Sequence, residues 1–244
     1  MNGCFSESFG SPARAFLGAA REALGAPALV LGASYIGFGS LVRASDMTVA
    51  MGLYSTFSGW ALPGQVALVE LYAVGASLAA IIVAVALTNV RLLPMTLALM
   101  PHLRAPGTKR WVYYLAAHLI AVTGWVNAMR RCPELPEEER LPFLFGFSGM
   151  LWVVCLVATV AGYYLAGSVP AQVSLGLVFL NPIYFMLVLT ADLRDPARLR
   201  AMALGAMLGP LFYFVDPDWG LLLTGVVAGT LGWLPKLVRT PSRG

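Results

Sequence analysis

The best candidates for chemistry in this sequence are the polar residues of one apolar stretch, residues 60–91. The stretch breaks at residues 62–64 (Leu-Pro-Gly) and restarts at Gln65. Inside a membrane, a break in a helix persists only where protein or a water-filled cavity satisfies the freed backbone groups. Transporters use such breaks to point the N-terminus of a half-helix at the substrate. The pattern predicts that Gly64 and Gln65 contact a small solute, although Pro-Gly is also typical of a plain loop.

Three more polar residues follow in the same stretch. A carboxylate in a membrane segment is a functional candidate, so Glu70 is a candidate for proton coupling. The alternative is that Glu70 lies near the interface or pairs with a partner protein. Arg91 cannot realistically lose its proton, so it must be paired or hydrated. Together with Asn89 it would suit a substrate carboxylate, and the alternatives are a structural ion pair or a contact with a lipid headgroup.

Residues for catalysis or metal binding are sparse. The only histidines are His102 and His118, and the sequence has no Ser-His-Asp set and no HExxH motif. The cysteines, Cys4, Cys132 and Cys155, are odd in number and far apart, so no metal spacing or disulfide framework follows. We therefore expect no enzyme, no cofactor and no metal site.

The composition predicts an all-α, polytopic integral membrane protein. The 244 residues are 59% apolar and only 11% charged, whereas an ordinary soluble domain carries about 25% charged residues. A spanning helix needs about 20 apolar residues, which leaves room for about seven or eight spans. The net charge of +4 comes from short basic clusters between apolar segments. Such clusters are topology signals, and they do not indicate nucleic-acid binding.

The chain is expected to consist of a polar tail and a short helix over residues 1–25, followed by one transmembrane domain over residues 26–238. The helix, from Pro12 to Gly25, suits the membrane interface, and the alternative is a slanted extension of the first span. The expected spans or broken spans are 26–42, 47–73, 76–100 (kinked at Pro94), 111–129, 142–166, 171–191, 201–215 and 221–234. Within 111–129, the seven-residue spacing of Trp111, His118 and Trp125 predicts one stripe on a helix.

The loops indicate orientation and a possible repeat. The loops at 130–140 and 192–200 are basic and are therefore expected in the cytoplasm. If the segment 47–73 crosses once, the basic loop at 102–110 lies outside, against the rule, and a re-entrant segment between 47 and 129 would remove this conflict. Asn181-Pro182 interrupts another apolar segment, as Pro63-Gly64 does, which would fit an inverted repeat.

The region 64–104 resembles the signature region of the AzlC family of bacterial branched-chain amino acid permeases. The matching features are Gln65, Gly75-Ala76-Ser77, Asn89-Val90-Arg91 and the leucine-rich stretch that ends at Pro101 to Arg104. The resemblance implies an inner-membrane exporter of branched-chain or related small neutral amino acids. It also implies a partner, a small AzlD-like membrane protein.

One position departs from the family pattern. The family usually carries an acidic Thr-Asp-Glu group in its fourth span, and this chain has Thr123-Gly124-Trp125 there. The loss of two acidic groups argues against proton coupling at that place. It also motivates an alternative function, a structural or assembly subunit of the membrane that does not transport.

Overall fold

The computed structural model describes residues 8–166, 170, 172–173, 176, 196–215 and 220–238. The chain divides into two compact units, residues 1–182 and 183–244, which are described separately. The described residues form helices and no strand, which confirms the all-α prediction. The expected span 171–191 with Asn181-Pro182 lies almost wholly outside the described residues, and so do Cys4 and residues 192–195 of the loop at 192–200.

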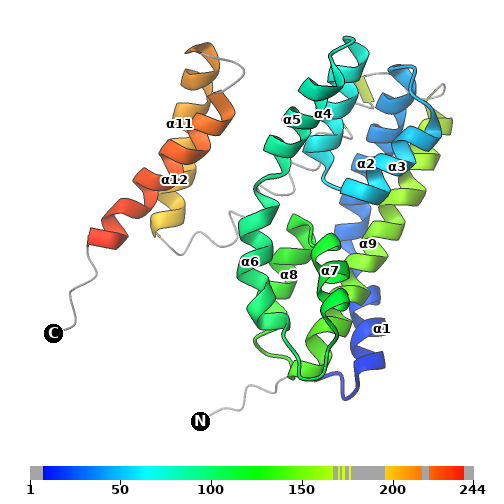
Figure 1. Ribbon diagram of the computed structural model, residues 1–244, viewed down its shortest axis with the longest axis vertical. Coiled ribbons are helices and arrows are strands. Elements are labelled where there is room, and N and C mark those ends of the chain that lie inside the picture. Colours follow the sequence, from blue (N-terminus) through cyan, green and yellow to red (C-terminus); the bar gives the residue numbers. More distant parts are fainter. Residues whose placement is uncertain are drawn as a thin grey trace. The chain divides into compact units, whose positions relative to one another are not determined.

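Two long parallel helices, α2 (Ala26–Ala44) and α9 (Glu137–Leu165), form the axis of the first unit (Figure 1). A Cβ added at Gly39 would collide with the Thr159 carbonyl, and one added at Gly162 would collide with the Ile36 carbonyl. Glycine on both helices therefore lets the two backbones touch, as in membrane helix pairs. Both helices are long and apolar enough to cross a membrane, which confirms the first and fifth predicted spans as helices of spanning length.

Helix α1 (Pro12–Ala23) confirms the predicted N-terminal helix and packs along the N-terminal half of α9. Its buried face consists of alanines, and a Cβ at Gly146 of α9 would collide with the Phe16 carbonyl. Ser11 caps the helix by accepting a hydrogen bond from the Arg14 N–H at 3.3 Å. The described residues do not show whether α1 lies at a membrane interface, so that assignment stays a prediction.

Between α2 and α9 the chain forms six short helices rather than full spans. They are α3 (Val49–Gly59), α4 (Leu62–Ala73), α5 (Leu78–Asn89), α6 (Leu92–Leu103), α7 (Arg110–His118) and α8 (Val122–Arg131). At about 1.5 Å per residue each is about 14–18 Å long. That length is about half of the roughly 30 Å hydrocarbon core of a bilayer.

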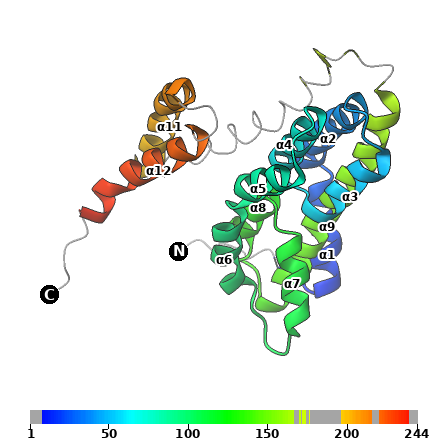
Figure 2. The ribbon, with the colours of Figure 1, turned by 45° about the horizontal axis from the view of Figure 1, so that its top comes forward.

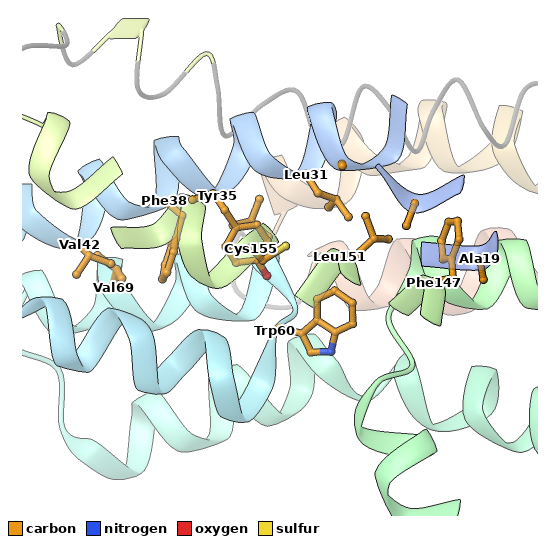
Figure 3. Close-up of a cluster of buried hydrophobic side chains, with 14 of the residues drawn as sticks. Ala19, Leu31, Tyr35, Phe38, Val42, Trp60, Val69, Phe147, Leu151 and Cys155 are labelled. Atoms are coloured by element: carbon orange, nitrogen blue, oxygen red, sulfur yellow. The ribbon is translucent and has the colours of Figure 1, made fainter. Parts of the chain in front are cut away.

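Helices α3 and α4 form a hairpin whose base lies toward the Leu165 end of α9. Near the base, a Cβ at Gly52 would lie 3.0 Å from Val42 of α2 and 3.6 Å from Thr159 of α9. Figure 3 shows Val69, late in α4, beside Val42, whereas Trp60 at the tip lies further along toward Leu151. The segment therefore returns to the end from which it started.

The connection after this hairpin explains a motif that the resemblance singled out. Gly75 has φ +73°, a left-handed conformation that glycine adopts without strain, and the chain reverses there. Ser77 then caps α5, since its hydroxyl accepts a hydrogen bond from the Ala80 N–H at 3.3 Å. Gly75-Ala76-Ser77 is thus a turn that ends one half-helix and starts the next.

Helices α5 and α6 form one broken segment with a bend of 44°. The sequence predicted a kink at Pro94, but the bend lies at Val90-Arg91. Pro94 is nevertheless its cause, because proline has no N–H to donate to the carbonyl four residues earlier, that of Val90. The Leu93 N–H donates to the Val90 carbonyl instead, at 3.1 Å.

The expected span 111–129 is a second hairpin, α7 and α8, so the prediction of a single span was wrong. Its base lies toward the Glu137 end of α9, the opposite end from the base of the first hairpin (Figure 2). The helix breaks at residues 119–121, which contain neither proline nor glycine. The predicted stripe from Trp111 to Trp125 does not form, because its members lie on two helices.

An apolar cluster joins α8 to α6 and α9. Its buried members include Leu99, Leu103, Cys132 and Leu144. Burial raises the pKa of the Cys132 thiol to about 11, and the charge of Arg140 offsets that shift only in part. Cys132 is therefore protonated at neutral pH and belongs to the packing.

The two hairpins settle where the basic loop at 102–110 lies. The Arg140 guanidinium donates to the His102 carbonyl at 3.3 Å, so this loop adjoins the Glu137 end of α9. The loops 102–110 and 130–140 therefore lie at the same end of the unit. This is the arrangement that a re-entrant segment between 47 and 129 would give, and with both basic loops at one end it agrees with the positive-inside rule.

The second unit pairs α11 (Pro196–Val215) with α12 (Gly220–Val238). A Cβ at Gly205 would touch Ala228 at 4.0 Å and one at Gly209 would touch Thr224 at 3.9 Å, so both glycines face α12. No described residue lies within 4 Å of a Cβ added at Gly225 or Gly229. The glycine of α12 in close contact is Gly232, where a Cβ would meet Ala201 at 2.7 Å.

Candidate substrate site at the hairpin tips

The three helix breaks of the first unit meet around one cavity of about 180 Å³. It has room for roughly six waters at about 30 Å³ each, or for one small solute. Helices α3, α5 and α7 end at this cavity, and α4, α6 and α8 begin beside it. The residues that line it are Ser58, Gly59, Trp60, Ala61, Asn89, Leu92, Ala117, His118 and Ile120.

The two hairpin tips are joined by a reciprocal pair of hydrogen bonds. The Trp60 indole N–H donates to the His118 carbonyl at 3.1 Å, and the His118 imidazole Nε2 lies 2.9 Å from the Phe57 carbonyl. Each tip thus contacts a carbonyl at the C-terminus of the other hairpin's first helix, where no intrahelical donor is available. Trp152, near the middle of α9, packs edge-on against His118 with ring centroids 6.2 Å apart.

Asn89 combines two unusual features at this cavity. Its Oδ1 is buried and forms no hydrogen bond with any described residue. Its side chain lies against Gly64, where an added Cβ would come within 2.6–2.9 Å of the amide atoms. The structure therefore brings two predicted site residues together, and only glycine at position 64 permits the contact. Buried acceptors are nearly always paired, so this oxygen is suited to a ligand donor.

Gln65 lies in the first turn of α4, as predicted, but its partners are protein groups. Tyr35 donates to its Oε1 at 2.7 Å, and its Nε2 donates to Ser55 at 3.0 Å and to Thr56 at 2.9 Å. Thr56 in turn contacts Thr159 of α9 at 3.2 Å. This polar network joins α2, α3, α4 and α9, and Gln65 is not among the residues that line the cavity.

The two charged candidates lie on the outside of the helices. Arg91 occupies the bend between α5 and α6, next to Asn89 and Leu92, but its side chain is exposed and does not line the cavity. Glu70 is exposed on α4 and forms no hydrogen bond or ion pair with a described residue. Their roles in binding and in proton coupling stay predictions.

The position that departs from the family pattern lies in the first turn of α8. A Cβ at Gly124 would collide with the Ser148 hydroxyl of α9. Both Ser148 Oγ and Thr123 Oγ1 are buried, and neither has a hydrogen-bond partner in the part of the chain that the structure describes. The α8 backbone therefore packs directly on α9, and a larger residue at position 124 would not fit without movement of Ser148.

Sequence reasoning missed part of this site. Trp60 and His118 were visible as an indole and an imidazole in apolar segments, but nothing near residue 119 marks a helix end. Ser148 and Trp152 lie in an apolar helix without any motif. Among the described residues there is also no group of three or more His, Cys, Asp or Glu that could hold a metal ion.

Comparisons with known proteins give the family. The model of the family described as AzlC protein matches residues 27–169, from the start of α2 to beyond the end of α9. Neither the curated proteins nor the solved structures gave a match. The match covers more than half of the 244 residues, and so the chain belongs to the AzlC family.

Proposed function

We propose that this protein transports branched-chain or related small neutral amino acids, and that the substrate binds in the cavity at the hairpin tips. The observation that carries the proposal is that three helix breaks meet at one cavity beside the unpaired Asn89 oxygen. Transporters of several folds bind substrates where broken helices meet near the middle of the bilayer. The family is associated with branched-chain amino acid transport, which supports the same substrate class.

A zwitterion matches the ends of the helices. Helices α3, α5 and α7 direct their carbonyl ends toward the cavity, and a carbonyl end favours positive charge. Together with the Asn89 Oδ1 as a further acceptor, these carbonyl ends suit the ammonium group of an amino acid. Helices α4, α6 and α8 start nearby, and their free N–H groups suit the carboxylate. In this proposal Arg91 adds positive charge beside α6.

Transport is proposed to be export across the bacterial inner membrane. The basic connections 102–110 and 130–140 lie at the Glu137 end, which would face the cytoplasm. We further propose six spans in all, since neither hairpin would cross the bilayer, and a small AzlD-like membrane protein as partner. Exposed apolar side chains of α5, such as Leu78 (72% exposed) and Ile82 (59% exposed), suit lipid or that partner. Glu70, on the neighbouring helix, would then carry a proton at the partner's surface.

The test is an efflux assay in cells that lack their own exporters. The cells receive this chain, with and without its genetic neighbour, and are loaded with valine-, leucine-, isoleucine- or methionine-containing dipeptides. Asn89→Leu conserves volume but removes the acceptor, and we expect release to fall at least about tenfold, the loss of one hydrogen bond to a charged group. Thr96→Val is the matched control, because among the described residues Thr96 bonds only the Leu92 carbonyl of its own helix, at 2.8 Å.

The outcomes separate transport from the alternative of an assembly subunit, which Gly124 and Trp125 in place of the family's acidic group motivate. Faster release that requires both chains and Asn89 supports the proposal and identifies the substrate. Release that Asn89→Leu leaves unchanged would refute this site. No release by both chains at normal membrane levels would favour the non-transporting subunit.

A further inference from the structure

We propose that a basic groove at the Glu137 end of the first unit binds the phosphodiester headgroup of a membrane phospholipid. The groove measures about 700 Å³, which far exceeds the cavity at the hairpin tips. It is lined by the end of α6, the connection to α7, the first turns of α7 and the start of α9. The lining residues include Arg104, Arg110, Tyr113 and Tyr114.

The two arginines of the groove are free to bind a ligand. Arg104 and Arg110 are exposed, and neither side chain forms a hydrogen bond or ion pair with a described residue. Guanidinium groups bind phosphate oxygens through paired N–H donors. Arg110 is also the first residue of α7, whose N-terminus has no side-chain cap. The positive end of that helix therefore adds to the attraction for an anion.

The connection that carries the arginines has a fixed shape. The Tyr113 hydroxyl accepts a hydrogen bond from the Ala105 N–H at 3.1 Å and lies 3.4 Å from the Ala105 carbonyl. Gly107 turns the chain with φ +76°. Arg104 and Arg110 are thus held at opposite ends of a tied loop, and both line the same groove.

The depth of the groove matches a headgroup. Helix α6 has 12 residues and α7 has nine, counted from the breaks at the cavity. At about 1.5 Å per residue, the arginines lie about 14–18 Å from those breaks. Half of a roughly 30 Å hydrocarbon core is about 15 Å. If the breaks lie at the midplane, as the proposed function requires, the arginines reach the level of the phosphates.

The surroundings suit a lipid better than a free anion. Trp111 is 57% exposed and Tyr114 76% exposed, and both types gather at the membrane–water boundary. Beside the groove lies a second, mainly apolar cavity of about 600 Å³, whose lining includes Val112, Leu141 and Phe145. Glu137 also lines the basic groove, and its single charge leaves the two arginines in excess. Basic pockets at the cytoplasmic side of membrane proteins bind anionic headgroups in this way.

Native mass spectrometry of the purified full chain tests the proposal. The probe is phosphatidylglycerol added to detergent-solubilised protein, and the readout is the fraction of protein that retains one lipid. Arg104→Ala with Arg110→Ala should lower that fraction about tenfold. The matched control is Arg14→Ala with Arg21→Ala, which removes the same charge from exposed positions on α1 and should leave lipid retention unchanged.

A second measurement uses only the unaltered chain. Phosphatidylglycerol should raise the thermal unfolding midpoint, whereas diacylglycerol, which lacks the phosphate, should not. Equal retention by the two double variants, or equal stabilisation by both lipids, would refute the headgroup site. If glycerol 3-phosphate displaced the lipid at equal concentration, the groove would be a site for free phosphates instead. None of these readouts involves transport, so their failure is distinct from failure of the proposed function.

Discussion

The two hairpins of the first unit differ in how their buried polar groups are paired. Under the tip of α3 and α4, the Gln65 amide bonds three protein partners at 2.7–3.0 Å. Where α8 starts against α9, the buried hydroxyls of Thr123 (α8) and Ser148 (α9) have no partner among the described residues. The first hairpin is thus fastened to α2 and α9 by a satisfied polar network, whereas the start of α8 meets α9 through the close packing of Gly124 on Ser148. The difference implies that the tip of the first hairpin is held rigidly beside the cavity and that the tip of the second hairpin is the more adaptable one.

The largest expected effect comes from breaking the network of the first hairpin. Gln65→Leu removes three hydrogen bonds and leaves the buried Tyr35 hydroxyl without its acceptor. A buried polar group without a partner costs about 1–3 kcal/mol, and several are created here. We expect the free energy of unfolding to fall by about 2–4 kcal/mol. Thermal unfolding in detergent, followed by size-exclusion chromatography, would show the lower midpoint.

Glu70→Gln is the control for this change, since Glu70 lies on the same helix but is exposed. Its unfolding midpoint should equal that of the wild type. The opposite result for Gln65 would also be informative. If Gln65→Leu kept its midpoint and membrane level but lost transport, Gln65 would contact the substrate, as the sequence predicted.

The next effect tests the close packing of the second hairpin. Gly124→Ala places a methyl group where the Ser148 hydroxyl now lies, so we expect a loss of about 1–3 kcal/mol in stability, typical of overpacking. Ser148→Ala removes a hydroxyl that has no partner and should change stability by less than about 0.5 kcal/mol. The double variant should recover at least half of the loss.

A double-mutant cycle on the unfolding midpoint measures this recovery as a coupling between positions 124 and 148. Additive effects would show that the two residues do not compete for the same space. Strong coupling would also explain why acidic groups are absent here, because an aspartate at position 124 would require a smaller neighbour on α9.

The sequence predicted those parts of this site that local chemistry marks. Pro63 is the second residue of α4, just after Ala61, which lines the cavity, and Gly64 and Asn89 were both chosen as binding residues and lie in contact. Gly75 and Ser77 likewise form the turn that their residue types favour. In each case the residue type alone restricts the backbone or offers a polar group.

What the sequence did not reveal depends on contacts between distant segments. The break after His118 has no proline or glycine, and it is stabilised by Trp60 and Phe57, about sixty residues earlier. Likewise, Gln65 was expected to contact a solute. Its hydrogen-bond partners lie on α2 and α3, and the residues next to Gln65 in the sequence do not identify them. Hairpin and span have the same local pattern, so the number of crossings could not be read from hydropathy.

The smallest expected effect concerns the hydrogen bonds that join the two tips. His118→Leu removes the imidazole contact to the Phe57 carbonyl, and Trp60→Phe removes the indole contact to the His118 carbonyl. Each bond contributes about 0.5–1.5 kcal/mol. We therefore expect small losses in unfolding free energy but a clear loss in efflux, since both side chains line the cavity. His118→Gln is the control, because its amide can still donate to that carbonyl.

If the two hairpin tips act as one unit, the losses in efflux caused by His118→Leu and by Trp60→Phe will not be additive. After either bond breaks, the hairpins can separate, and the second substitution then removes a contact that is already weakened. Additive losses in efflux would instead mean that each residue acts on the substrate independently. In that case the adaptable second hairpin, rather than the contact between the tips, would determine how tightly the cavity holds its solute.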